Sequence, residues 1–118
     1  MKKACYIIGM NESQIDMVVE LFRARVRKGL GSALVAIYWF GSRARGDFDE
    51  SSDYDLLLET KDEITEKQRN LVADLAVEIS ADLDAWLDIH YRTVKWMSTP
   101  PYSFSPFIQT IRSEGILL

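Results

Sequence analysis

The apolar positions in the first third of the chain follow two different spacings. In the segment 11–31, NESQIDMVVELFRARVRKGLG, they recur every three or four residues, which is typical of one face of an α-helix. Ser13, followed three residues later by Asp16, resembles a capping box, and the closing glycines are expected to end the helix. The apolar run SALVAIYWF, Ser32–Phe40, is too short for a typical helix. It predicts a strand buried on both faces. The expected inward-facing helix residues are Ile15, Val18, Val19, Phe22 and Val26.

The same two spacings alternate through the rest of the chain. DYDLLLE, Asp53–Glu59, predicts a second strand, and the segment 61–83 predicts a second helix. The segment 84–96, DAWLDIHYRTVKW, predicts a third strand. Near the end, residues 105–115 begin with a Ser-Pro pair suited to a helix start and finish with a glycine suited to a helix end. The expected inward-facing residues of the second helix are Ile64, Leu71, Leu75, Val77 and Ile79.

The resulting order is helix, strand, strand, helix, strand, helix. This order predicts an α/β (α+β) fold in which helices pack on a small mixed sheet. The 118 residues are the length of one domain, so we expect a single domain over residues 1–118.

Charge and cysteine content narrow the classes of function. The net charge of −4 and pI near 4.9 argue against general nucleic-acid binding, which requires a basic surface. The single cysteine, Cys5, excludes a disulfide within the chain. The first apolar run is interrupted too early for a signal peptide or a membrane span, so a cytoplasmic protein without membrane association is expected.

Two aspartates at the start of the second predicted strand are candidates for a metal site. Side chains two residues apart in a strand point to the same face, so Asp53 and Asp55 are expected to project together. Adjacent carboxylates repel unless a cation lies between them or one is protonated. Mg²⁺ is bound through a few carboxylates and substrate phosphates. The alternative is a solvated acidic turn without a ligand.

The residues that precede these aspartates favour a nucleotide. Gly41 and Ser42 follow the first predicted strand, where a helical turn would offer free backbone N–H groups to phosphate. Arg43 and Arg45 place guanidinium groups nearby. A phosphate cradle and a pair of metal ligands would therefore face each other across one loop, as a nucleoside triphosphate with Mg²⁺ requires.

A two-metal site needs a third carboxylate. Asp82 and Asp84 lie where the second helix gives way to the third strand, so capping or solvation explains them. Asp88 lies between apolar residues within the predicted strand, where an acid is costly without a partner. We favour Asp88, with Asp84 as the alternative.

These residues together resemble a known family. GSRARGDFDESSDYD has G-S, ten residues and then D-x-D, and with the closing EGILL it resembles the minimal nucleotidyltransferases of the DNA polymerase β superfamily. The resemblance implies that fold, with Gly41 and Ser42 on the triphosphate of ATP and Asp53, Asp55 and Asp88 on two Mg²⁺ ions. Arg43 is assigned to the nucleotide as well, while the parts played by Arg45 and His90 stay open.

The resemblance also implies a partner. Many small members of this family are similar to antitoxins that transfer AMP to a tyrosine of a HEPN ribonuclease toxin, which makes a hetero-oligomer possible. Two alternatives stay open from the sequence. One is a non-enzymatic antitoxin that neutralises its partner by binding alone, and the other is a nucleotidyltransferase acting on small molecules.

Overall fold

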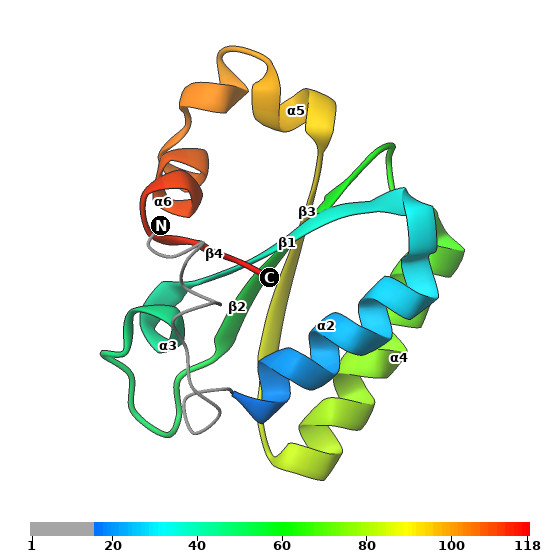
Figure 1. Cartoon of the computed structure of the whole chain (residues 1–118), viewed down its shortest axis with the longest axis vertical. Helices are drawn as coiled ribbons and strands as arrows, with labels where there is room; N and C mark the ends of the chain where they lie inside the picture. The colour runs from blue at the N-terminus through cyan, green and yellow to red at the C-terminus, as the bar shows by residue number, and fades with distance from the viewer. Residues whose placement is uncertain (1–15) are drawn as a thin grey trace.

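Four strands form one mixed sheet in the order β3-β2-β1-β4 (Figure 1). The structure is a computed structural model that describes residues 16–118. Strand β1 is antiparallel to β2 and β4, whereas β2 and β3 are parallel. The strands are β1 (Leu34–Phe40), β2 (Tyr54–Thr60), β3 (Leu87–Thr93) and β4 (Ile116–Leu117).

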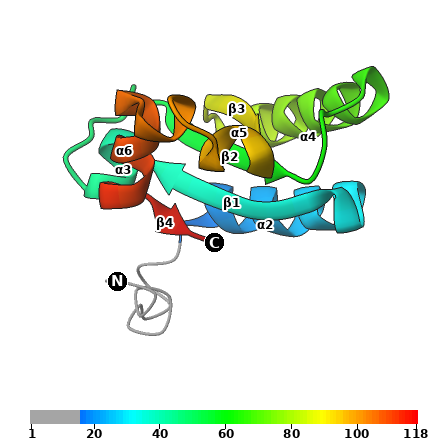
Figure 2. The same cartoon turned by 90° about the horizontal axis from the view of Figure 1, so that it is seen from above.

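The helices lie on both faces of this sheet. The two longest, α2 and α4, lie side by side in Figure 1, while the others gather around the opposite face and one end of β1. In Figure 2 the arrow of β1 points to the end where α3 and α6 lie. The helices are α2 (Met17–Leu30), α3 (Gly41–Arg45), α4 (Glu66–Leu83), α5 (Val94–Ser98) and α6 (Pro106–Glu114), with 3₁₀ turns η2 (Gly31–Ala33) and η3 (Tyr102–Phe104).

Alternation along the strands divides the core into two clusters. Ile37 and Trp39 of β1 and Leu56 and Leu58 of β2 face α2 and α4, where Phe22 is fully buried. The alternate residues of β1 and β2 face the opposite side of the sheet. On that side Phe40 and Leu57 pack with Met97, Ile108 and Ile111 from α5 and α6. The predicted fold class, with helices on a small mixed sheet, is confirmed, and so is a first strand buried largely on both faces.

Several predicted boundaries were wrong by a few residues because local capping decides them. The second helix begins at Glu66, since Thr65 and Gln68 form a capping box, and Ile64 therefore precedes it. Strand β3 ends at Thr93, whose hydroxyl accepts a hydrogen bond from Trp96 N and caps α5. The sequence analysis did not predict α5. The last helix was confirmed, with its cap at Ser105 and its end at Gly115.

The first helix begins later than predicted. Asp16 is its N-cap, and its carboxylate accepts hydrogen bonds from the backbone N–H groups of Val18 and Val19 at 2.8 and 3.3 Å. The predicted cap Ser13, the predicted core residue Ile15 and the single cysteine Cys5 lie outside the described residues. Over residues 16–118, no helix has the length and apolar character needed to cross a membrane.

The prediction that Val77 faces the core was wrong. Val72 and Ile79 of α4 are fully buried, whereas Val77 is 67% exposed. Residues two positions apart in an α-helix are separated by about 200° around its axis, so Val77 and Ile79 point to opposite sides. The β-branched Val77 therefore lies on the solvent side of α4.

This contrast predicts different costs for two substitutions in one helix. Ile79→Ala should lower the free energy of unfolding by about 2–5 kcal/mol, because it removes fully buried methylene groups and leaves a cavity. Val77→Ala should change it by less than about 0.5 kcal/mol. Urea denaturation followed by circular dichroism measures both, and similar losses for the two variants would contradict the packing described for α4.

Candidate active site

Three strands bring the candidate residues into one row. Phe40, the last residue of β1, pairs with Asp55 of β2, and Asp55 pairs with Asp88 of β3. Gly41 follows Phe40 directly and begins α3. The predicted helical turn after the first strand is therefore present, and the register places Gly41, Asp55 and Asp88 at the same end of the sheet.

The close approach of Gly41 and Asp55 requires glycine. Gly41 has a φ angle of +83°, which other residues rarely adopt. A Cβ atom added there would overlap the Asp55 carboxylate and lie 2.9 Å from its Cγ atom. The backbone at the start of α3 is thus held against the acid at the start of β2.

The Asp55 carboxyl group lies in an unfavourable electrostatic environment. Partial burial raises its pKa above the usual range, and the neighbouring charges of Asp88 and Asp53 raise it further, while His90 acts in the opposite direction. The structure thus gathers Asp53, Asp55 and Asp88 closely enough for their charges to interact. Such an excess of carboxylate charge is the condition under which a cation stabilises an acidic cluster.

The donor set fits Mg²⁺ as a partial set of ligands. Carboxylate oxygens are the donors that this ion prefers, and it usually keeps waters and substrate phosphates as its other ligands. Within residues 16–118, no group of three or more acidic, histidine or cysteine side chains is arranged to enclose a metal by itself. Phosphate oxygens and water would therefore have to complete the ligand set beside the aspartates.

The two other candidates for the third acid lie elsewhere. Asp84 ends α4 in a left-handed conformation with φ of 50°, and Asp82 lies on the exposed side of the same helix. Neither shares the row of Asp55 and Asp88. The pairing of Asp88 with Asp55 in the sheet therefore favours Asp88 as the third acid, and its role in catalysis stays a prediction.

His90 is held beside Asp88 on the face covered by α6. Its Nε2 atom lies 3.3 Å from Asp88 Oδ2, and its ring packs against Phe40 and Phe107 at centroid distances of 5.8 and 5.3 Å. These contacts fix the imidazole between the apolar core and the acid. His90 can therefore orient the Asp88 carboxylate.

Arg43 ties the loop between α3 and β2 to the helix. Its Nε atom donates to the backbone oxygen of Ser52 at 2.8 Å, and Nη2 donates to that of Glu50 at 3.2 Å. Nη1 donates to the Tyr54 hydroxyl at 3.1 Å, and the guanidinium lies over the Phe48 and Tyr54 rings. Because Ser52 precedes Asp53, Arg43 fixes the backbone that carries two of the acids. The predicted contact of Arg43 with a nucleotide stays a prediction.

Asp16 and Tyr54 extend this network to the first helix. The Tyr54 hydroxyl donates to Asp16 Oδ2 at 2.8 Å, while Asp16 Oδ1 caps α2. Burial and the hydrogen bond to Asp16 raise the pKa of Tyr54 to about 12. The sequence pattern predicts a capping box that includes Asp16 but indicates no role for Tyr54. The sequence signal that could have indicated a role for Tyr54 is its position between Asp53 and Asp55.

Ser42 and Arg45 complete the helical turn. The backbone oxygen of Ser42 accepts hydrogen bonds from the N–H groups of Gly46 and Asp47. Arg45 forms ion pairs with Asp47 at 3.2 Å and with Glu114 of α6 at 2.8 Å. In this arrangement Arg45 connects α3 to α6.

Sequence comparison identifies the family. Residues 30–118 match the profile of the family described as "Polymerase beta, Nucleotidyltransferase". A curated protein of Methanocaldococcus jannaschii, provisionally named a protein adenylyltransferase, is 31% identical over 105 residues, which are 87% of this chain and 97% of that protein. The chain therefore belongs to the polymerase β-type nucleotidyltransferase family, and the resemblance read from its sequence is confirmed.

Solved structures agree with this fold. A toxin–antitoxin crystal structure with AMP-PNP matches with a TM-score of 0.55 and 22% identity, covering 81% of this chain and 68% of the other. A Sulfolobus solfataricus structure, provisionally named a nucleotidyltransferase, matches with a TM-score of 0.50 and 21% identity, covering 93% and 89%. These likenesses show the fold, and with the family they establish the protein as a nucleotidyltransferase.

The contacts of Arg43 and Arg45 predict unequal effects on stability. Arg43→Met should lower the free energy of unfolding by about 1–3 kcal/mol, because it leaves loop carbonyls and the Tyr54 hydroxyl without their donor. Arg45→Met removes only solvent-screened ion pairs and should cost much less than Arg43→Met. Urea denaturation of both variants measures the difference. Equal losses would show that Arg43 does not hold the loop.

Because the pKa of Asp55 is raised, we predict that replacing this acid by a neutral side chain increases thermal stability in a pH-dependent way. An unfolded aspartate has a pKa of about 4, and the folded value is higher, so ionisation destabilises the folded chain as pH rises through that range. In metal-free buffer with EDTA, Asp55→Asn should therefore raise the melting temperature relative to the original protein at pH 7. The difference should disappear near pH 3, where Asp55 is protonated. A difference independent of pH would contradict this electrostatic origin.

Proposed function

We propose that this protein is a Mg²⁺-dependent adenylyltransferase that transfers AMP from ATP to a tyrosine of a HEPN-type toxin and thereby acts as its antitoxin. The observation that carries the proposal is the row formed by Gly41, Asp55 and Asp88, with Asp53 beside it. It joins a site of close backbone approach to a cluster of carboxylates. A triphosphate and its metal ions need both.

The relatives support the donor and the type of acceptor. The 31% identical relative carries a name that assigns it to protein adenylyltransferases, which favours a protein acceptor. The toxin–antitoxin structure of the same fold includes AMP-PNP, an ATP analogue. Together they favour ATP as the donor and a toxin as the partner. Such a pair would form a hetero-oligomer in the cytoplasm, where ATP is available.

Different residues of the row would bind the triphosphate and the metal ions. The backbone of Gly41 and Ser42, at the start of α3, would contact the triphosphate, because glycine permits a phosphate to approach the chain closely. Asp53, Asp55 and Asp88 would hold Mg²⁺. When bound, Mg²⁺ would supply charge neutralisation to the triphosphate and to the leaving pyrophosphate. Arg43 would contribute by holding the loop that carries Asp53, since three of its nitrogen atoms already donate within the protein.

The reaction is an in-line substitution at the α-phosphorus of ATP. The tyrosine oxygen of the acceptor forms the new bond to phosphorus, and the bond between the α-phosphorus and the pyrophosphate oxygen breaks. Asp88 would accept the proton of the attacking hydroxyl, and His90, whose Nε2 atom lies 3.3 Å from Asp88 Oδ2, would orient its carboxylate. The products are the adenylylated protein and pyrophosphate.

Substitution of the acids tests the proposal. Asp53→Ala and Asp55→Ala should each reduce the transfer of label from α-labelled ATP to the purified partner by at least about 10²-fold, the order of loss expected when one electrostatic contact to a transition state is removed. Glu50→Ala is the matched control, because Glu50 lies in the same loop and contributes only its backbone oxygen to the contact with Arg43. It should keep its activity within about twofold.

The same assay distinguishes the two other hypotheses. Mass spectrometry should find added AMP on a partner tyrosine. Partner inhibition that survives Asp55→Ala without any label transfer would indicate a binding antitoxin. Label transfer to small hydroxylated acceptors, with none to the partner, would indicate a small-molecule enzyme.

A further inference from the structure

A hollow lies at the other end of the parallel strand pair from the acidic row. It has a volume of about 290 Å³ and is lined mainly by the ends of β2 and β3 and by the segments that follow them. Thr60 pairs with Thr93 there, five residues along the strands from the pair Asp55 and Asp88. At about 3.3 Å per residue, the two sites are roughly 16 Å apart. The hollow is therefore separate from the candidate active site.

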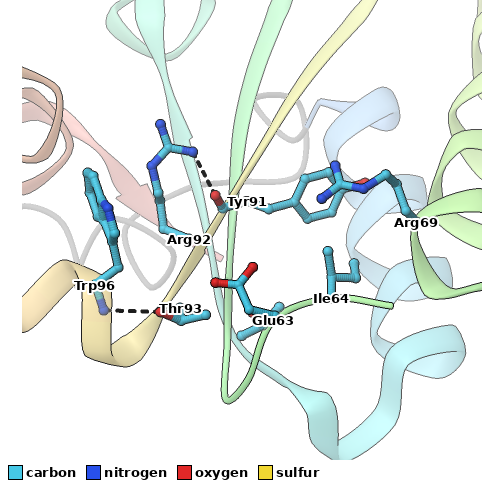
Figure 3. A pocket seen from close by; sticks show the side chains of 8 residues that line it. Glu63, Ile64, Arg69, Tyr91, Arg92, Thr93 and Trp96 are labelled. Carbon is cyan, nitrogen blue, oxygen red and sulfur yellow. Dashed lines mark hydrogen bonds between the residues drawn. The ribbon is translucent and has the colours of Figure 1, made fainter. Parts of the chain in front are cut away.

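Two arginines flank this hollow, each held against aromatic rings. Arg69 of α4 lies over the Tyr91 ring at 4.4 Å. Arg92 of β3 lies over Trp96 at 4.8 Å, and its Nη1 atom donates to the Tyr91 backbone oxygen at 2.7 Å. Figure 3 shows Arg92 and Trp96 on one side, Arg69 with Tyr91 on the other, and Glu63 between them. Stacking holds both guanidinium groups in place before any ligand binds.

Within the described part of the chain, neither arginine of the hollow forms an ion pair, although Glu59 of β2 is paired with Arg92 in the register of the sheet. Among residues 16–118, Glu63 pairs with neither Arg69 nor Arg92. Two arginines and one glutamate give this site a net positive charge, although the whole chain carries −4. The hollow is thus a local cationic site that complements an acidic group.

Exposed aromatic side chains continue beyond the hollow. Tyr102 stacks on Trp96 with ring centroids 5.1 Å apart and is 49% exposed, and Phe104 of the same 3₁₀ turn is 71% exposed. A volume near 290 Å³ is at the lower limit for small-molecule pockets. A small ligand would leave these rings in water, whereas a protein surface would cover them. Tyrosine, tryptophan and arginine are also the residues most enriched at the energetic centres of protein interfaces.

We propose that Arg69, Arg92, Trp96 and Tyr102 form a docking surface for an acidic segment of the partner protein. The inference rests on the proposed function, because it takes the HEPN-type protein as the partner. It adds the position of the contact, which is distant from the acids that would catalyse transfer. The partner would then be held at one end of β2 and β3 and modified at the other.

Charge changes in the hollow provide the test. Binding of a purified HEPN-type protein, the partner assigned by the proposed function, is measured by calorimetry at 150 mM salt. Arg69→Glu and Arg92→Glu should each weaken binding by about tenfold or more, because each places a carboxylate against the acidic segment. Glu63→Gln should strengthen binding about two- to fivefold, since it removes the one negative charge of the hollow.

Lys67→Glu is the matched control. It makes the same charge change on α4, at an exposed residue that does not line the hollow, and it should alter the dissociation constant by less than about twofold. Thermal melts identify any variant that has lost its fold. If Arg69→Glu and Lys67→Glu weaken binding equally, if Glu63→Gln has no effect or weakens binding, or if the original protein does not bind the partner, the docking surface is wrong.

Activity measurements separate this inference from the proposed function. If both are correct, Arg69→Glu raises the KM for the partner and leaves kcat and the KM for ATP within about twofold. AMP transfer that is unaffected by all three substitutions would overturn the docking surface and leave the function intact. Arginine-dependent binding without AMP transfer would overturn the function and retain the surface. An affinity for ATP lowered tenfold by Arg92→Glu would show a nucleotide subsite instead.

Discussion

The alignment of β1, β2 and β3 at one end of the sheet is the constraint on which the site depends. Hydrogen bonding between the strands pairs Phe40 with Asp55 and Asp55 with Asp88, so a shift of one residue in either pairing would separate the acids or turn them to the other face. The buried residues Leu56, Leu57 and Leu58 of β2 resist such a shift, because alternate residues fill the two core clusters. Core packing therefore fixes the relative positions of the acids.

This arrangement has an energetic cost that the surrounding contacts offset. The Asp55 carboxyl group is partly buried beside two other acids, and its pKa is raised first by burial and then by their repulsion. Arg43, Tyr54 and Asp16 form a continuous hydrogen-bonded network that joins the loop before Asp53 to the start of α2. The acids are thus held by backbone and polar contacts on one side and by the sheet on the other. Strain of this kind is usual at functional sites.

The parts of the fold that could be predicted from sequence were those with a local cause. The G-S and D-x-D motifs and the Ser-Pro start of α6 each act within a few residues, and all lie where the spacing placed them. The predictions for Val77 and for the end of β3 were wrong, because tertiary packing decides the first and the cap at Thr93 decides the second. The bond between Tyr54 and Asp16 joins residues 38 positions apart, and the hollow combines three segments of the chain. No local pattern reports such contacts.

The direction of the strands explains why the two proposed sites lie apart. In open parallel sheets, ligands bind beyond the carboxyl ends of the strands. Here the antiparallel strand β1 brings its own carboxyl end, with Gly41, to the amino ends of β2 and β3. The proposed nucleotide site lies where acids at the starts of two strands meet the backbone that follows a third strand. The carboxyl ends of β2 and β3 are left for the hollow that Arg69 and Arg92 flank. One reversed strand therefore gives the same parallel pair two chemically different ends, one acidic and one cationic, to which the two proposals assign separate functions.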